Sequence, residues 1–264
     1  MPTAANASFS APTRQLPDVR RIDASDLRWA LAEGWKDFLA KRGDLIFAGA
    51  LYPLVCLVAA LLTFNEPLLP LFFPLVAGIS IAGPAVASGF YELARRREEG
   101  QDSGWRHFLD PLRGRSRTPL VTLTIGLAVL FVGWLTVAYV IYAGTFGART
   151  PMHLADLGGR IFSTPEGWSM IILGNLAGGL FAVATLVFSV VSFPMVIDQP
   201  VDADIAVRTS IKAVRANPLA MLGWGVRVAL LLLLGLIPLA IGLAVVLPWL
   251  GYATWHLYTR VVVR

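Results

Sequence analysis

The sequence predicts an all-α protein, a polytopic membrane helix bundle of about six transmembrane helices with two amphipathic helices on its cytoplasmic face. The first observation is the run over residues 221–258, in which Arg227 and His256 are the only acidic or basic side chains. A soluble domain of 264 residues has no interior large enough for so long an apolar run. The second observation is the composition, because 56% of the residues are hydrophobic and only 15% are charged, whereas soluble domains carry about 25% charged residues.

Residues 1–23 differ from the rest of the chain. They are polar, rich in Pro, Ala and Ser, and contain no apolar run, so they predict a disordered cytoplasmic tail rather than a cleaved signal peptide. Residues 24–264 are predicted to form a single helical transmembrane domain. The one cysteine, Cys56, lies inside an apolar run and is expected to act as a small buried hydrophobe.

Four apolar stretches reach the length needed to cross a bilayer, which is roughly 20 residues for about 30 Å of hydrocarbon. They predict spans over residues 43–64, 68–93, 119–146 and 167–197. The second stretch carries three prolines, which predict a kinked helix because each interior proline removes a backbone hydrogen bond; they are Pro70, Pro74 and Pro84.

The closing stretch is too long for one span. Residues 219–258 would extend about 60 Å as a single helix, about twice the hydrocarbon thickness. Gly235, Pro238 and Gly242 are the only breaking residues near its middle, so we expect a hairpin with spans over 219–237 and 239–260. The alternative is one tilted span ending near Pro248, followed by an interfacial helix.

The placement of basic residues predicts the orientation. Arginine and lysine concentrate before residue 43, between residues 95 and 117, and between residues 208 and 215. The positive-inside rule assigns all three segments to the cytoplasm. With six spans both termini are cytoplasmic, in a multi-pass protein of the bacterial inner membrane, whereas five spans would export the C-terminus.

Two segments outside the spans have amphipathic patterns. Leu27, Leu31, Trp35 and Phe38 recur at helical spacing before the first span, and this face is interpreted either as a docking surface for a partner or as an interfacial anchor. After the fourth span, residues 201–218 predict a surface helix with an apolar stripe of Ala203, Val207, Ile211 and Val214.

Small residues predict where the helices pack closely, because lipid tails provide no hydrophobic drive for helix association. The second and fourth spans are the candidates for the closely packed centre. Asn175 is expected to donate a hydrogen bond across a helix interface. The helix-packing candidates are Gly78, Gly83, Gly174, Gly178 and Asn175.

The sequence contains no catalytic, cofactor-binding or metal-binding motif that we can identify. Its three histidines are spread over a cytoplasmic loop, an outer loop and the last span, which excludes a multi-histidine haem or copper centre. The remaining ionisable groups near the spans are grouped as one polar cluster. Arg227 is expected to snorkel to the headgroups or to pair with an acid of this cluster. The cluster comprises Glu92, Asp198, Arg227 and His256.

Three segments carry a family resemblance: residues 73–100, with Gly-Pro followed by Gly-x-Tyr-Glu, residues 192–218, and residues 247–262, with Gly-Tyr-Ala-Thr-Trp-His-x-Tyr. They resemble the bacterial integral membrane family called domain of unknown function 2189. The resemblance implies an integral membrane fold without an assigned reaction. Some relatives are labelled terminal oxidase subunit I, and an accessory association with respiratory or photosynthetic complexes is compatible with the resemblance.

These observations together predict a non-enzymatic inner-membrane protein. We expect it to be an accessory or assembly subunit of a larger membrane complex, with membrane lipids and other integral membrane subunits as partners, no cofactor and no nucleic acid. The alternative is a transporter of a small solute or lipid, and an enzyme is the third choice.

Overall fold

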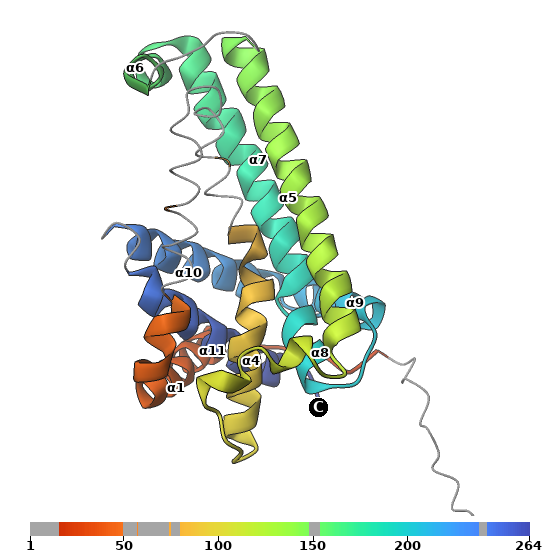
Figure 1. Ribbon diagram of the computed structural model, residues 1–264. Coiled ribbons are helices and arrows are strands. Elements are labelled where there is room, and N and C mark those ends of the chain that lie inside the picture. The colour runs from red at the N-terminus through yellow and green to blue at the C-terminus, as the bar shows by residue number, and fades with distance from the viewer. Residues whose placement is uncertain (1–15, 50–56, 58–73, 75–79, 148–153, 238–241) are drawn as a thin grey trace, which may run out of the picture.

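The computed structural model describes residues 16–49, 57, 74, 80–147, 154–237 and 242–264. Within these residues the chain forms nine α-helices, three short 3₁₀ helices and no named strand (Figure 1). The α-helices are α1 (Ala24–Gly49), α4 (Gly83–Glu98), α5 (Arg117–Phe146), α6 (Leu154–Ser163), α7 (Pro165–Ser189), α8 (Ser192–Asp198), α9 (Ala203–Ala216), α10 (Pro218–Leu236) and α11 (Leu243–Val261). The predicted helical membrane fold is confirmed.

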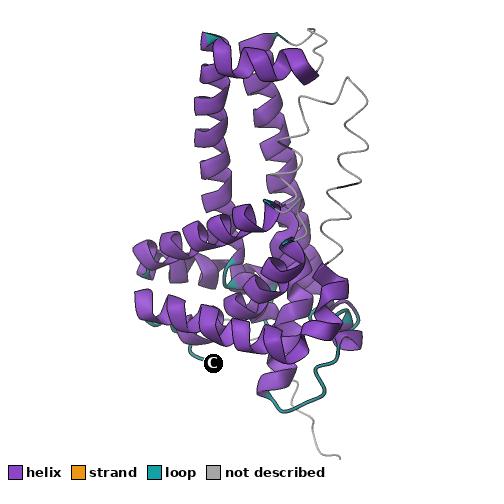
Figure 2. Cartoon of the chain, turned by 90° about the vertical axis from the view of Figure 1, so that its left-hand side faces the viewer, coloured by secondary structure: helices purple, strands orange, loops and turns teal. Residues whose placement is uncertain are grey.

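The helices form two parts (Figures 1 and 2). Helices α5 and α7 stand side by side as a long pair, with α6 at one end. Helices α1, α4, α8, α9, α10 and α11 gather at the other end, and we call this group the base. The pair packs through small residues against rings, since Gly178 faces Trp134 and Gly133 faces Phe181.

Three described helical stretches are long and apolar enough to cross a membrane: Arg117–Phe146, Pro165–Asp198 and Pro218–Leu236. The span predicted over residues 119–146 agrees with α5. The predicted span over residues 43–64 lies largely outside the described residues, and of the span predicted over residues 68–93 the described part is residue 74 and residues 80–93, which include the start of α4. The number of crossings stays a prediction.

The kink predicted at Pro84 does not occur, because Pro84 lies in the first turn of α4, where a helix needs no N–H donor. Pro70 lies outside the described residues.

The span predicted over residues 167–197 is broken between α7 and α8. Pro194 has no N–H for the carbonyl four residues earlier. The Ser210 hydroxyl of α9 stabilises the break by donating to the Val187 carbonyl at 2.7 Å and accepting from the Val191 N–H at 3.3 Å.

Helices α1 and α11 pack closely within the base. A Cβ atom placed on Gly34 would lie 2.5 Å from the Ala253 nitrogen, so the two backbones touch. Trp249 of α11 donates its indole N–H to the Leu31 carbonyl at 2.8 Å. Leu27 and Phe38 are buried, and Trp35 remains 37% exposed.

This contact corrects the interpretation of the first amphipathic helix. The predicted apolar face exists, but Leu27 and Phe38 lie inside the protein core and are not accessible to a partner or to lipid. The second amphipathic helix, α9, also turns a different stripe inward. Its buried residues are Ala206, Thr209, Ser210 and Ala213, while the predicted stripe lies at the edge of the core.

We predict that Gly34→Ala destabilises the protein, whereas Gly174→Ala does not. Both changes replace a helical glycine by alanine, and this replacement by itself stabilises a helix by about 1 kcal/mol. Only at Gly34 does the new methyl meet backbone atoms, since no described atom lies within 4 Å of the corresponding position at Gly174. Overpacking of this kind costs about 1–3 kcal/mol. Thermal unfolding in detergent should therefore rank Gly174→Ala above wild type and Gly34→Ala below it, and the reverse order would contradict the contact.

Candidate functional site

The second half of α4 carries most of the charge in the base. Arg95, Arg96 and Arg97 lie in its last turn, where positive charge complements the helix dipole. The helix ends at Glu98, and the chain turns at Gly100, whose φ of +69° is a conformation that glycine adopts without strain. The Gly100 and Gln101 N–H groups then close the end by donating to the Arg97 and Arg96 carbonyls.

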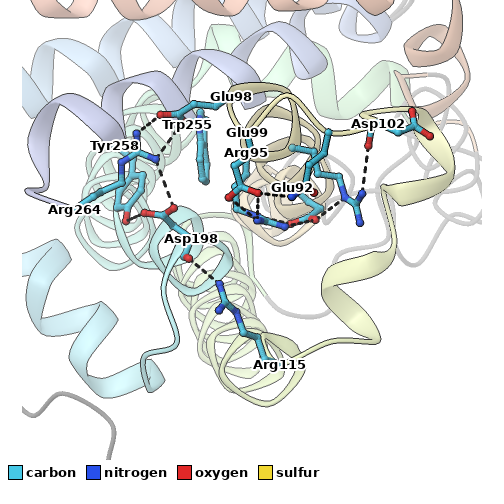
Figure 3. Close-up of polar contacts among 12 residues, drawn as sticks. Glu92, Arg95, Glu98, Glu99, Asp102, Arg115, Asp198, Trp255, Tyr258 and Arg264 are labelled. Atoms are coloured by element: carbon cyan, nitrogen blue, oxygen red, sulfur yellow. Dashed lines mark hydrogen bonds and ion pairs between the residues drawn. The ribbon is translucent and has the colours of Figure 1, made fainter. Parts of the chain in front are cut away.

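The first of three polar networks centres on Glu92, which is buried (Figure 3). Its carboxylate accepts from Arg95 Nη2 at 2.7 Å and from Arg96 Nε at 2.9 Å. Arg96 also reaches Asp110 of the following loop at 3.0 Å, and Arg95 reaches Glu99 at 2.8 Å. The network therefore attaches the loop after α4 to the helix itself.

The second network joins α4 to α1 and α11. Asp37 of α1 is buried and pairs with Arg97 Nε at 3.0 Å and with His256 Nε2 at 2.8 Å. The Trp29 and His256 rings are nearly perpendicular, with 5.5 Å between their centroids, and the Arg260 guanidinium lies 3.9 Å from the centre of the Trp29 ring.

The third network joins α4 to α8 and to the last residues of the chain (Figure 3). Glu98 accepts from the Trp255 indole at 3.1 Å and forms an ion pair with Arg264. Asp198 accepts from the Tyr258 hydroxyl at 2.7 Å and pairs with Arg264 at 3.5 Å. We call the three networks together the polar layer.

The charged partners shift several pKa values in the polar layer and the adjoining loop. Hydrogen bonding to Glu92 raises the pKa of Arg95 and outweighs the opposing effect of burial. Burial alone would raise the pKa of Glu98, but the Arg264 guanidinium and the Trp255 indole lower it overall. In the loop, the Gly104 N–H and then Arg106 lower the pKa of Asp102 to about 2. These carboxyl groups are therefore ionised and paired at neutral pH.

The structure distributes the predicted polar cluster over separate contacts. Glu92, His256 and Asp198 fall in the first, second and third networks respectively. Arg227 is in none of them and donates to the Gly223 carbonyl of its own helix at 2.9 Å. The expected pairing of Arg227 with Glu92 or Asp198 is thus replaced by a bond within α10.

The helix-packing candidates also divide. Gly178 packs against Trp134 of α5, so the fourth predicted span packs on the third, whereas Gly174 has no described atom near it. Asn175 is exposed and donates to the Ile171 carbonyl of its own helix at 2.8 Å, not across a helix interface. Gly83 begins α4, and Gly78 lies outside the described residues.

One hollow adjoins the first network. It has a volume of about 280 Å³ and is lined by charged side chains of both signs, including Glu92, Arg95, Asp110 and Arg115. Its two acids, Glu92 and Asp110, are each paired with an arginine. Among the described residues, no three metal-ligating side chains meet at one point.

Sequence reasoning missed Asp37 and Asp110 as members of the polar layer. The ion pairs within α4 could have been predicted from the sequence. Glu92 precedes Arg95 and Arg96 by three and four residues, which is the spacing of ion pairs on one helix face. No sequence pattern predicts the contact between Asp37 and His256, because the two residues are 219 positions apart.

Helices of membrane-crossing length, joined to one charged end, define an integral membrane protein of the helical class. Residues 72–198 match the family described as "Predicted integral membrane protein (DUF2189)". The match covers α4 to α8 and confirms the resemblance found in the sequence. No curated protein and no solved structure matches the chain.

We predict that Glu92→Gln destabilises the protein by about 1–3 kcal/mol, because it weakens two partly buried guanidinium contacts at once. The matched control is Glu33→Gln, which removes an ion pair with Lys36, whose side chain is 67% exposed. That change should cost less than about 1 kcal/mol. Chemical unfolding in detergent measures both variants, and equal effects would show that burial of Glu92 contributes nothing.

We predict that the contribution of Glu98 to stability disappears in acid. Its pKa is lower in the folded protein than its usual 4.5, so the stabilisation is complete above pH 4.5. It is lost as the pH falls through the lowered pKa. Because the side chain is 43% exposed, solvent screening limits the effect to about 1 kcal/mol or less. Wild type should unfold at a higher temperature than Glu98→Gln at neutral pH and at the same temperature near pH 2, and a constant difference would contradict the charge effect.

Proposed function

We propose that the protein is a non-enzymatic accessory or assembly subunit of a larger membrane complex, of the respiratory or photosynthetic kind. The observation that carries this proposal is the stretch of α7 around Asn175, which no described residue covers. Positions Gly174 and Gly179 have no described atom within 4 Å of an added Cβ, and Asn175 between them is exposed. Small residues on a membrane helix allow another helix to approach closely.

The polar layer supports a structural rather than a chemical role. The charges of α4 pair with Asp37 of α1, with Asp110 of the adjoining loop and with Arg264 after α11, so these groups hold the base together instead of facing a substrate. A catalytic acid or base would need to reach a reacting group with its proton-transfer atom. The paired carboxylates Glu92 and Asp37 do not have that freedom.

The placement of basic residues supports an orientation with the base in the cytoplasm of a bacterial inner membrane. The basic turn of α4, the arginines before α5 and the basic side of α9 all lie in the base, at one end of the α5 and α7 pair (Figure 1). By the positive-inside rule this end is cytoplasmic. The end that carries α6 then faces the other compartment.

Purification in a mild detergent tests the proposal. We predict that wild type co-purifies in stoichiometric amount with a larger membrane assembly, and that Gly174→Leu combined with Gly179→Leu reduces the bound partner by roughly tenfold, equivalent to about 1.4 kcal/mol. Gly144→Leu is the matched control, because Gly144 is an equally open position on α5 and lies outside the proposed surface. This control should retain the partner.

Two outcomes would contradict the proposal. The first is a protein that purifies alone, with the double variant indistinguishable from wild type. The second concerns Arg227, which bonds only within its own helix among the described contacts. If Arg227→Met abolished the flux of a solute or lipid across vesicles while leaving folding and assembly unchanged, the protein would be a transporter.

A further inference from the structure

Helix α10 runs across the long axes of α5 and α7 in both views of the molecule (Figures 1 and 2). It meets α7 near the end of that helix, since a Cβ on Gly225 would lie 3.1 Å from the Leu186 side chain, one turn before Ser189. A helix that crossed the bilayer with α5 and α7 would instead follow them along their length.

The two sides of α10 differ in what they meet. Met221, Trp224 and Gly235 are buried on the side toward the base, and Gly235 lies against Leu243 at the start of α11. The opposite side is an exposed stripe with helical spacing and without a polar group. We call it the α10 stripe; it comprises Leu222, Val226, Leu230, Leu233 and Ile237.

Polar groups lie on the far side of α10 from the α5 and α7 pair. Beneath it, α11 carries Trp255, His256 and Tyr258, which contact the charged residues of the polar layer. Ion pairs of this kind are costly at the centre of a bilayer and tolerated near water. The base therefore places α10 between an ion-paired layer and the level of the membrane-crossing helices.

Arg227 agrees with a shallow position. It is the only charged residue of α10, lies outside the α10 stripe and donates to Gly223. A long basic side chain at the edge of the hydrocarbon reaches the headgroups without leaving its helix. The same side chain two turns into an upright span would have to be accommodated in the hydrocarbon.

We propose that α10 is an in-plane helix, with the α10 stripe embedded in the acyl chains of the leaflet next to the base and α11 on its aqueous side. The occupant is the lipid of that leaflet, because the stripe is as apolar and exposed as the outer faces of α5 and α7, and α10 contacts α7 at Gly225 and Leu186. In this arrangement α10 and α11 replace the fifth and sixth predicted crossings. The inference does not depend on the proposed role as a subunit.

Depth measurements in reconstituted bilayers test this arrangement. In a Cys56→Ser background, single cysteines at Leu222, Val226, Leu230 and Leu233 carry a nitroxide whose accessibility to oxygen and to a nickel chelate reports its depth. We expect a flat profile, with all four labels within about 5–10 Å of the headgroup boundary, as for other interfacial helices. The labels replace exposed side chains, so they leave the packing of the base intact.

Helix α5 supplies the matched control within the same protein. Labels at Val121, Val129, Val132 and Val140 are equally exposed and follow a helix that runs the length of the pair. Their depths should rise to about 15 Å in the middle of α5 and fall again toward its ends. An α10 profile that rises at Val226 and Leu230 as the α5 profile does would overturn the in-plane helix and restore two crossings.

Discussion

The base of this protein depends on the pairing of charges that are partly removed from water. An unpaired ion in such a place costs several kcal/mol, so each acid must meet a cation or a hydrogen-bond donor. Helix α4 carries Glu92, three consecutive arginines and Glu98 on its last turns, and these residues contact α1, α11 and the loop before α5. Through Arg264 they also connect to Asp198 of α8. The apolar pair of α5 and α7 extends from this charged end, so one pairing requirement also separates the membrane part of the molecule from its polar part.

Local patterns in the sequence predict part of this fold well. The apolar length of α5 locates its ends, because nothing within 119–146 interrupts the helix. The break after Ser189 was missed since it needs both Pro194 and a hydroxyl from α9, which no local window contains. The periodicity before the first predicted span identified an apolar face at Leu27 and Phe38, but periodicity does not say whether lipid, a partner or α11 covers it.

The polar contacts and the path of α10 were less accessible to sequence reasoning. The pairs of Glu92 with the two following arginines obey helical spacing, whereas Asp37 and His256 meet only after the chain has folded. Charge placement cannot distinguish two crossings from an in-plane hairpin, because either path returns Arg260 and Arg264 to the side of α9. The deciding information is the direction of α10 relative to α7, which is a property of tertiary packing.

The contact of α1 with α11 joins a helix made early in translation to one made at its end. The ribosome makes Asp37 long before His256, and the two are 219 positions apart in the chain. At about 5–20 residues per second, α1 waits on the order of tens of seconds for its covering helix. During that interval α11 is absent from the close-packing surface at Gly34. The close contact at Gly34 and Ala253 can therefore form only after nearly the whole chain has been made.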